Sequence, residues 1–275
     1  MNMMQMVGLM VICFFITLTL LCIYRKAINI KVANAVFIIV DLVFFFCWNY
    51  SGYLAGWLDD GYLTLENISP FIMTLIPLTV FLNDRVKAYC RSAIAFLWLG
   101  MFVALIFSPQ HAYLNSFKSD ANLIYASEAA CHLLASLYGL FLIITGQVKC
   151  DIKHWKRAII CMYSVIGFGV MLNYLFHKSN FGMNPYGNYS IYMIDIFHSF
   201  EATLAAYLLG VLLVLTLGMQ VGYLFNKLFD STGWKPHEHH DHSEAEKVEM
   251  STVAEVTETA EQIAADQPVA EEQTL

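Results

Sequence analysis

Three ionisable side chains recur at every third position of a segment that is otherwise suited to lipid. The segment YMIDIFHSFEAT, residues 192–203, carries Asp195, His198 and Glu201. Charged groups within lipid are costly, so they normally face the interior of a helix bundle, pair with one another and mark a functional site. On a helix these three positions span about 120°, so at most two of them converge on one small target.

A second group lies in SEAACHLL, residues 127–134, where Glu128 and His132 are four apart and share one helix face. A carboxylate beside a histidine fixes its tautomer and makes the ring a general base. We therefore expect His132 to act as the base and Glu128 to orient it. Cys131 points about 100° away, which favours a packing role. A water activated by His132 needs no side-chain nucleophile.

The depths of these groups in their helices are similar. With a rise of about 1.5 Å per residue, they lie roughly 6–15 Å from the outer helix ends. We therefore predict one outward-facing polar cavity, with Glu66 as a further catalytic group and with substrate-binding positions at Asp41, Asn173, Asp195, His198 and Glu201. The alternative is that acid–histidine pairs tie helices together in a dry core.

Two other chemistries use the same residue types. A catalytic zinc ion needs three His, Asp or Glu ligands and an open position, a set that Asp195, His198 and His132 would supply. Because no HExxH motif is present, we expect no cofactor, with zinc as the alternative. A series of Asp, His and Glu is also typical of proton relays, although the sequence lacks the internal repeat of many transporters.

The composition places these residues in a membrane. Of the 275 residues, 58% are hydrophobic and 13% are charged, with a mean hydropathy of +0.57, values outside the usual range of soluble domains. The sequence has no basic, aromatic-rich stretch of the kind that binds nucleic acid, and the expected partner is membrane lipid. Five of the seven cysteines lie in apolar segments without metal-ligand or disulfide spacing and are interpreted as small buried hydrophobes: Cys13, Cys22, Cys47, Cys131 and Cys161.

The apolar segments predict an all-α, polytopic bundle of about seven transmembrane helices, since about 20 apolar residues cross the hydrocarbon layer. The third segment contains Pro70 and Pro77, which predicts a kink or break. The expected limits are 3–24, 33–57, 67–82, 90–108, 123–147, 158–177 and 191–225.

Lys and Arg follow the odd-numbered segments, whereas the alternate loops carry only Lys118 and Lys178. Cytoplasmic loops are enriched in Lys and Arg. We therefore expect an outside N-terminus, a cytoplasmic C-terminus and a multi-pass location in the cell membrane.

Residues 236–275 differ in composition, with 11 of the 22 acidic residues and a single basic one, Lys247. Such a segment cannot bury enough apolar surface to offset the entropy of ordering. The sequence therefore predicts a helical bundle over 1–235 and a disordered acidic cytoplasmic tail over 236–275. The run HEHHDH in this tail is interpreted as solvated rather than metal-binding.

Three segments resemble the YwaF-like bacterial integral membrane proteins in order and spacing. They are LTLENISPFIMTLIPLTVFLNDRVKAY (63–89), SEAACHLLASLYGLFLI (127–143) and VIGFGVMLNYLFHKSNF (165–181). That family is similar, more distantly, to a vertebrate transmembrane acyltransferase that remodels ether phospholipids and to the androgen-induced fatty-ester hydrolases. The resemblance, over roughly residues 35–225, implies a multi-helix bundle in which a buried histidine acts with a nucleophile on lipid acyl groups.

The resemblance places the family histidine at His132 and its Asn-Tyr pair at Asn173 and Tyr174. It breaks at Glu66, which occupies the position of the relatives' nucleophilic cysteine. Either the acyl-enzyme chemistry is lost, or Glu66 acts as a base or metal ligand near His132. The expected function is a lipid-directed acyltransferase or hydrolase; the alternative is a proton-coupled transporter or a small-molecule-sensing membrane protein.

Overall fold

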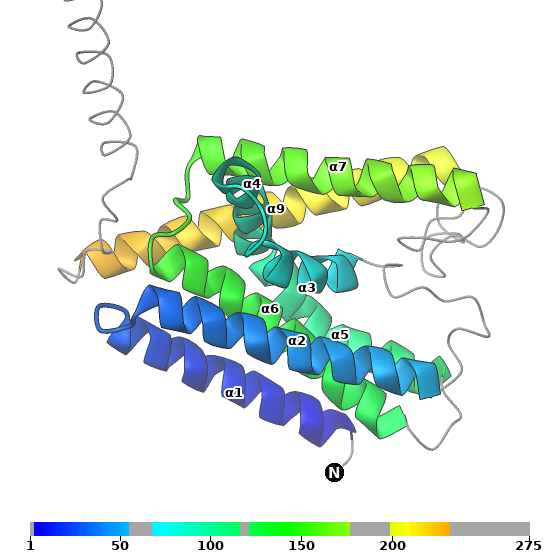
Figure 1. Ribbon diagram of the computed structural model, residues 1–275, viewed down its shortest axis with the longest axis horizontal. Coiled ribbons are helices and arrows are strands. Elements are labelled where there is room, and N and C mark those ends of the chain that lie inside the picture. Colours follow the sequence, from blue (N-terminus) through cyan, green and yellow to red (C-terminus); the bar gives the residue numbers. More distant parts are fainter. Residues whose placement is uncertain (1–2, 55–67, 116–120, 177–198, 232–275) are drawn as a thin grey trace, which may run out of the picture. The chain divides into compact units, whose positions relative to one another are not determined.

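Helices form the regular structure of the described residues, which are 3–54, 68–115, 121–176 and 199–231 of the computed structural model (Figure 1). No strand is present in these ranges, which confirms the predicted all-α class for them. The helices are α1 (Met3–Tyr24), α2 (Ile30–Leu54), α3 (Ile68–Leu78), α4 (Asp84–Phe96), α5 (Trp98–Asn115), α6 (Ala121–Ile144), α7 (Ile152–Phe176) and α9 (Phe200–Ser231). The predicted acidic tail lies outside the described residues.

Helix α6 is the centre of the packing. It contacts α1, α2, α3, α4, α5 and α9, and 89% of its apolar stretch is buried, against 11% in α1 and 6% in α2. Tyr138, Phe141 and Leu142 of α6 are fully buried. A helix that is apolar all round is either a core helix or a membrane span, and here α6 is enclosed by protein while α1 and α2 present apolar side chains outward.

Four described helices are long and apolar enough to cross a membrane, and a fifth span is added if α4 and the first half of α5 form one bent span. These helices make the chain a membrane protein. The seven predicted spans and the orientation of the termini stay predictions. The four spans are Gln5–Tyr24, Ile30–Leu54, Ala126–Ile144 and Phe200–Leu228.

The predicted continuous span over 90–108 is broken at Leu97, where α4 and α5 meet at an angle of 44°. Polar groups from two neighbouring helices contact the break. The Ser136 hydroxyl of α6 donates to the carbonyl of Trp98 (2.9 Å), and the Trp98 indole donates to the carbonyl of Gly218 in α9 (3.2 Å). Broken helices are tolerated at membrane depth where neighbours satisfy the backbone in this way.

The segments that carry most Lys and Arg residues meet at one end of the described bundle. This end contains the beginnings of α2, α4 and α7 and the ends of α6 and α9. Three contacts tie them together: Asn34 donates to Gln147 (3.0 Å), the Arg157 guanidinium lies 5.9 Å from the ring centre of Tyr89, and the Asn226 amide contacts the Cys150 sulfur at 3.9 Å. The charge that the sequence distributes over separate loops is therefore concentrated at one end.

Candidate functional site

Helix α6 positions the two ionisable residues that the sequence pairs. His132 is 1% exposed and Glu128 is 9% exposed. Ala129, which follows Glu128 in α6, forms a small apolar cluster with Met6 of α1 and Leu105 of α5. The imidazole is therefore held in the protein interior and does not face lipid.

The ring of His132 is oriented by the backbone of Glu128. Its Nδ1 lies 2.8 Å from the Glu128 carbonyl oxygen. A carbonyl only accepts hydrogen bonds, so Nδ1 carries the proton and Nε2 of the neutral ring keeps its lone pair. Nε2 is buried and has no hydrogen-bond partner among the described residues. This is the arrangement of an oriented base with its accepting atom unused.

The contact differs from the expectation that the Glu128 carboxylate would orient the ring. The carboxylate does interact electrostatically with His132, but the hydrogen bond that fixes the ring is made by the main chain. The two residues are therefore close together, as predicted, but the backbone carbonyl oxygen of Glu128, not its carboxylate, accepts the hydrogen bond from the ring.

Asp41 of α2 approaches α6 on a second face. It is fully buried, and neither carboxylate oxygen has a hydrogen-bond partner within the described ranges. It interacts electrostatically with the Cys131 thiol and the Tyr138 hydroxyl, which lie two turns apart on one side of α6. Glu128 also interacts with Cys131, so this thiol, which the sequence assigned to packing, is within electrostatic reach of both acids.

Asp41 and the imidazole of His132 share one level of the bundle, and Glu128 lies one helical turn further along α6. At about 1.5 Å per residue, Asp41 lies about 17 Å from the start of α2 and His132 about 18 Å from the end of α6. These helix ends are adjacent, because Asn34 bonds to Gln147. We call Asp41, Glu128, Cys131 and His132 the mid-bundle cluster.

The mid-bundle cluster occupies two faces of α6. Glu128, His132 and Ser136 follow one another at intervals of four, and Ser136 bonds to Trp98 of α5, so this stripe faces α5. Cys131 lies about 100° away around the helix, toward Asp41. The cluster therefore offers a base on one side and a carboxylate on the other.

The remaining predicted site residues are not brought to this cluster by the described structure. Glu201 lies in the first turn of α9 with an exposed side chain, whereas the sequence predicted an interior position. An acid at a helix N-terminus is stabilised by the helix dipole without burial. Asn173 lies in α7, but its side chain is outside the described set; Glu66, Asp195 and His198 lie outside the described residues altogether.

No group of three or more His, Cys, Asp or Glu side chains is arranged to hold a metal ion within the ranges the structure describes. The zinc alternative depends on Asp195 and His198, which are not described. It therefore stays a prediction.

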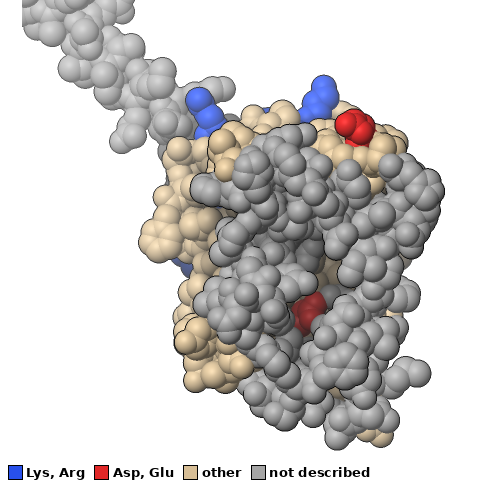
Figure 2. Space-filling model, turned by 90° about the vertical axis from the view of Figure 1, so that its right-hand side faces the viewer, with Lys and Arg blue, Asp and Glu red and all other residues tan. Residues whose placement is uncertain are grey.

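Figure 2 shows the face at which α2 and α7 end. Acidic side chains of the described residues are visible in this view.

A part-buried hydrogen-bond network next to the cluster could not be foreseen from the sequence. The Tyr138 hydroxyl donates to Asn34 (2.9 Å), Asn34 donates to Gln147 (3.0 Å), and the Gln147 amide donates to the Thr145 hydroxyl (2.9 Å). These residues are neutral, so no charge marks them in the sequence. In two of the three contacts the partners are 104 or more positions apart, and in the third they are two positions apart. Only the packing of α2 against α6 reveals them.

The described part of the chain is thus that of a helical membrane protein with a buried acid–histidine cluster at mid-depth. Comparisons with protein-family models, with curated proteins and with solved structures find no match.

Proposed function

We propose that the protein is an enzyme of the cell membrane that acts on lipid ester bonds, by hydrolysis or acyl transfer, with His132 as general base. The observation that supports this proposal is the ring of His132, which is fixed through Nδ1 and leaves Nε2 buried and without a partner among the described residues. A base held in this way accepts a proton without first breaking another hydrogen bond.

In the proposed reaction, a water or a lipid alcohol transfers its proton to Nε2 as its oxygen bonds to the ester carbonyl carbon. The bond from this carbon to the alkoxy oxygen then breaks, and Nε2 returns the proton to the leaving alcohol. Hydrolysis yields a fatty acid and an alcohol, and acyl transfer yields a new ester and an alcohol. Because His132 is buried, bulk water is kept away from the base.

The resemblance to the YwaF-like proteins supports lipid as the substrate class. Under this proposal Glu66 is a second base or a metal ligand near His132. Asn173, Asp195 and His198 are proposed as substrate-binding positions, together with Asp41. A water activated by His132 removes the need for the cysteine nucleophile that the relatives have at the position of Glu66.

His132→Gln tests the proposal. Glutamine is polar but is not a base at neutral pH, so we expect release of fatty acid from an ester-linked phospholipid to fall about 10²–10⁴-fold, the usual contribution of a general base. The measurement is mass spectrometry of lipids in vesicles that contain the purified full chain.

His154→Gln is the matched control, because His154 lies at the start of α7, away from α6. It should keep wild-type turnover, and both variants should stay folded at the temperature of the assay. Full turnover in a folded His132→Gln variant would contradict the proposal.

Asp41 supports a second candidate, a proton-coupled transporter. Buried carboxylates and imidazoles are the groups that form proton relays in membranes, and both carboxylate oxygens of Asp41 lack a hydrogen-bond partner in the described ranges. A pH gradient across the vesicle membrane distinguishes the two functions, since it drives transport but not ester turnover.

A further inference from the structure

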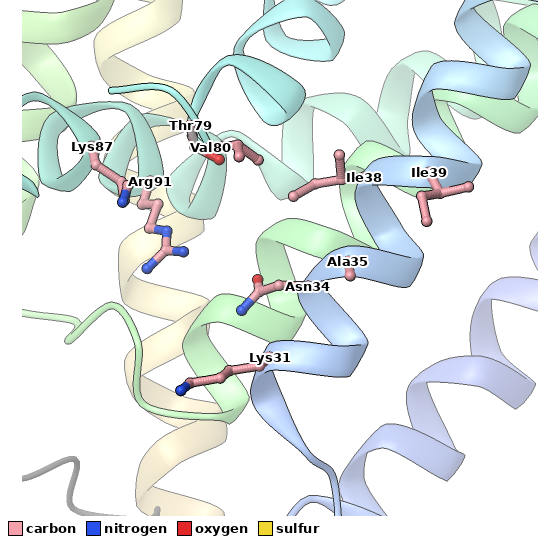
Figure 3. A pocket seen from close by; sticks show the side chains of 9 residues that line it. All are labelled: Lys31, Asn34, Ala35, Ile38, Ile39, Thr79, Val80, Lys87 and Arg91. Carbon is pink, nitrogen blue, oxygen red and sulfur yellow. The ribbon is translucent and has the colours of Figure 1, made fainter. Parts of the chain in front are cut away.

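A cavity of about 420 Å³ lies at the basic end of the bundle, between α2, the end of α3 and the start of α4 (Figure 3). Three of its lining side chains are cations, Lys31 from α2 and Lys87 and Arg91 from α4. In Figure 3, Lys31 extends from α2 toward α4, and Lys87 and Arg91 extend from α4 toward the same space. None of the described residues that line it is acidic. We call this cavity the basic pocket.

The positive charge of the basic pocket is only partly compensated. Lys87 pairs with Asp84 (3.1 Å), whose side chain is 98% exposed and lies outside the lining. Within the described residues no carboxylate forms an ion pair with Lys31 or Arg91. Uncompensated cations in a restricted cavity concentrate anions, and charge-assisted hydrogen bonds to phosphate are among the strong ones.

Asn34, a polar residue that lines the pocket, also favours a ligand that accepts hydrogen bonds. Asn34 is held by two hydrogen bonds, one from the Tyr138 hydroxyl and one to Gln147. The carboxamide has two N–H groups, so one amide hydrogen of Asn34 is not used by these bonds. The pocket therefore offers an amide donor beside its cations, in a side chain whose orientation is already fixed.

The apolar side of the pocket leads toward the outer surface of α2. Ile39 lines the pocket and is 61% exposed. Val43 and Phe46 follow at intervals of four and three on the same helix face, with exposures of 55% and 68%. A ligand that fits both parts has an anionic head and an apolar chain.

We propose that the basic pocket binds the phosphate headgroup of an anionic membrane phospholipid, with an acyl chain lying along Ile39, Val43 and Phe46. Basic pockets between membrane helices bind such headgroups, and the cavity volume lies within the range of small-molecule sites. A phospholipid headgroup and a free phosphate ion would both satisfy the cations of the pocket. The exposed apolar side chains of Ile39, Val43 and Phe46 on α2 favour the lipid. This site stands apart from the mid-bundle cluster and does not depend on the proposed enzyme activity.

The test is a native mass-spectrometry titration of the full chain in neutral detergent. The probes are dioctanoyl phosphatidylglycerol, dioctanoyl phosphatidylcholine and inorganic phosphate. We expect the wild type to bind phosphatidylglycerol more tightly than the other two. Lys31→Gln with Arg91→Gln should weaken this binding about 30-fold, since each cation near an anionic headgroup contributes about fivefold.

Lys26→Gln with Lys153→Gln is the matched control, because both lysines are exposed at the same end and neither lines the pocket. The control should bind as the wild type does. If the double pocket variant does not fold, Lys31→Gln alone replaces it, since Lys31 is exposed, and about a fivefold loss is expected. Equal losses in the control, no preference over phosphatidylcholine, or phosphate bound as tightly as the lipid would each overturn the proposal.

Discussion

His132 shows how a helix orients a buried base without a second side chain. Side chains on a helix tilt toward its N-terminus, which brings the ring of His132 to the carbonyl of Glu128. This carbonyl has two lone pairs, so it accepts the ring N–H in addition to its helical bond. The spacing of four predicted the pair but not the accepting atom, because spacing identifies a shared face and says nothing of which oxygen lies nearest.

The position of Asp41 could be predicted only in part. A lone aspartate in an apolar segment predicts burial, and the carboxylate is fully buried. Its proximity to Cys131 could not be predicted, because it depends on how α2 packs against α6. For Glu66, Asp195 and His198, which lie outside the described residues, the sequence expectation stays a prediction.

Asp151 caps the first turn of α7, and it carries a prediction at the scale of a single residue. Its Oδ1 accepts hydrogen bonds from the backbone N–H and from ring Nδ1 of His154, both at 2.8 Å. Partial burial acts to raise the pKa of Asp151, but the hydrogen bonds from the His154 backbone and ring, together with the charge of that ring, outweigh it. The pKa of the carboxyl therefore lies below its usual value.

Because this pKa is lowered on folding, the carboxylate contributes its full stabilisation above about pH 4 and loses it as the pH falls through the folded-state value. We expect Asp151→Ala to lower the free energy of unfolding by about 1 kcal/mol at pH 7, and Asp151→Asn, which keeps a capping oxygen, by less. The difference between wild type and Asp151→Ala should shrink below about pH 4. Chemical unfolding in detergent measures it, and a pH-independent difference would contradict the role of the charge.

The sequence predicted that these helices exist better than it predicted where each of them begins and ends. The expected start of the sixth segment at 158 lies after the observed start of α7 at Ile152, whose first turns contain Lys153, Lys156 and Arg157. The apolar criterion detects only the part of a helix that suits hydrocarbon, and helices continue beyond it into the polar interface. The break at Leu97 could not be predicted, since its polar partners come from α6 and α9.

Gly218 allows α9 to pass directly over the end of α4. A Cβ atom at Gly218 would overlap the carbonyl of Phe96, whereas one at Gly210, two turns earlier in α9, would meet nothing within 4 Å. We expect Gly218→Ala to lower the free energy of unfolding by about 1–3 kcal/mol, because neither backbone can move far in a packed interface.

Gly210→Ala is the control for this change. It should leave stability unchanged or raise it, since alanine favours a helix over glycine by about 1 kcal/mol. Thermal unfolding of both variants in the same detergent gives the comparison. Equal effects at the two positions would show that the contact between α4 and α9 does not need glycine.

Basic residues and the buried acid–histidine cluster lie at different levels along the length of the described bundle. Its basic segments gather at one end around the basic pocket, while Asp41 and His132 of the mid-bundle cluster lie about 17–18 Å further along α2 and α6. The positive-inside rule then predicts that the pocket faces the cytoplasmic leaflet, where anionic lipids are attracted by such charge. The charge asymmetry could be predicted from the sequence, because it depends only on which loops carry Lys and Arg. The pocket could not be predicted, because it depends on how α2, the end of α3 and α4 are placed around it.

Asp41 provides the prediction that concerns the molecule as a whole. A proton path through the bundle requires a titratable group between its two ends, and Asp41 lies at mid-depth with both oxygens unpaired within the described ranges. If the protein conducts or couples protons, Asp41→Asn should abolish proton entry into vesicles under an imposed pH gradient, because asparagine keeps the size of the side chain but releases no proton. A pH-sensitive dye inside the vesicles measures the entry.

Asp84→Asn, at an exposed carboxylate of the basic end, should conduct as the wild type does. Vesicles of the wild type that admit no more protons than empty ones would exclude the relay and leave the esterase as the function that the cluster supports.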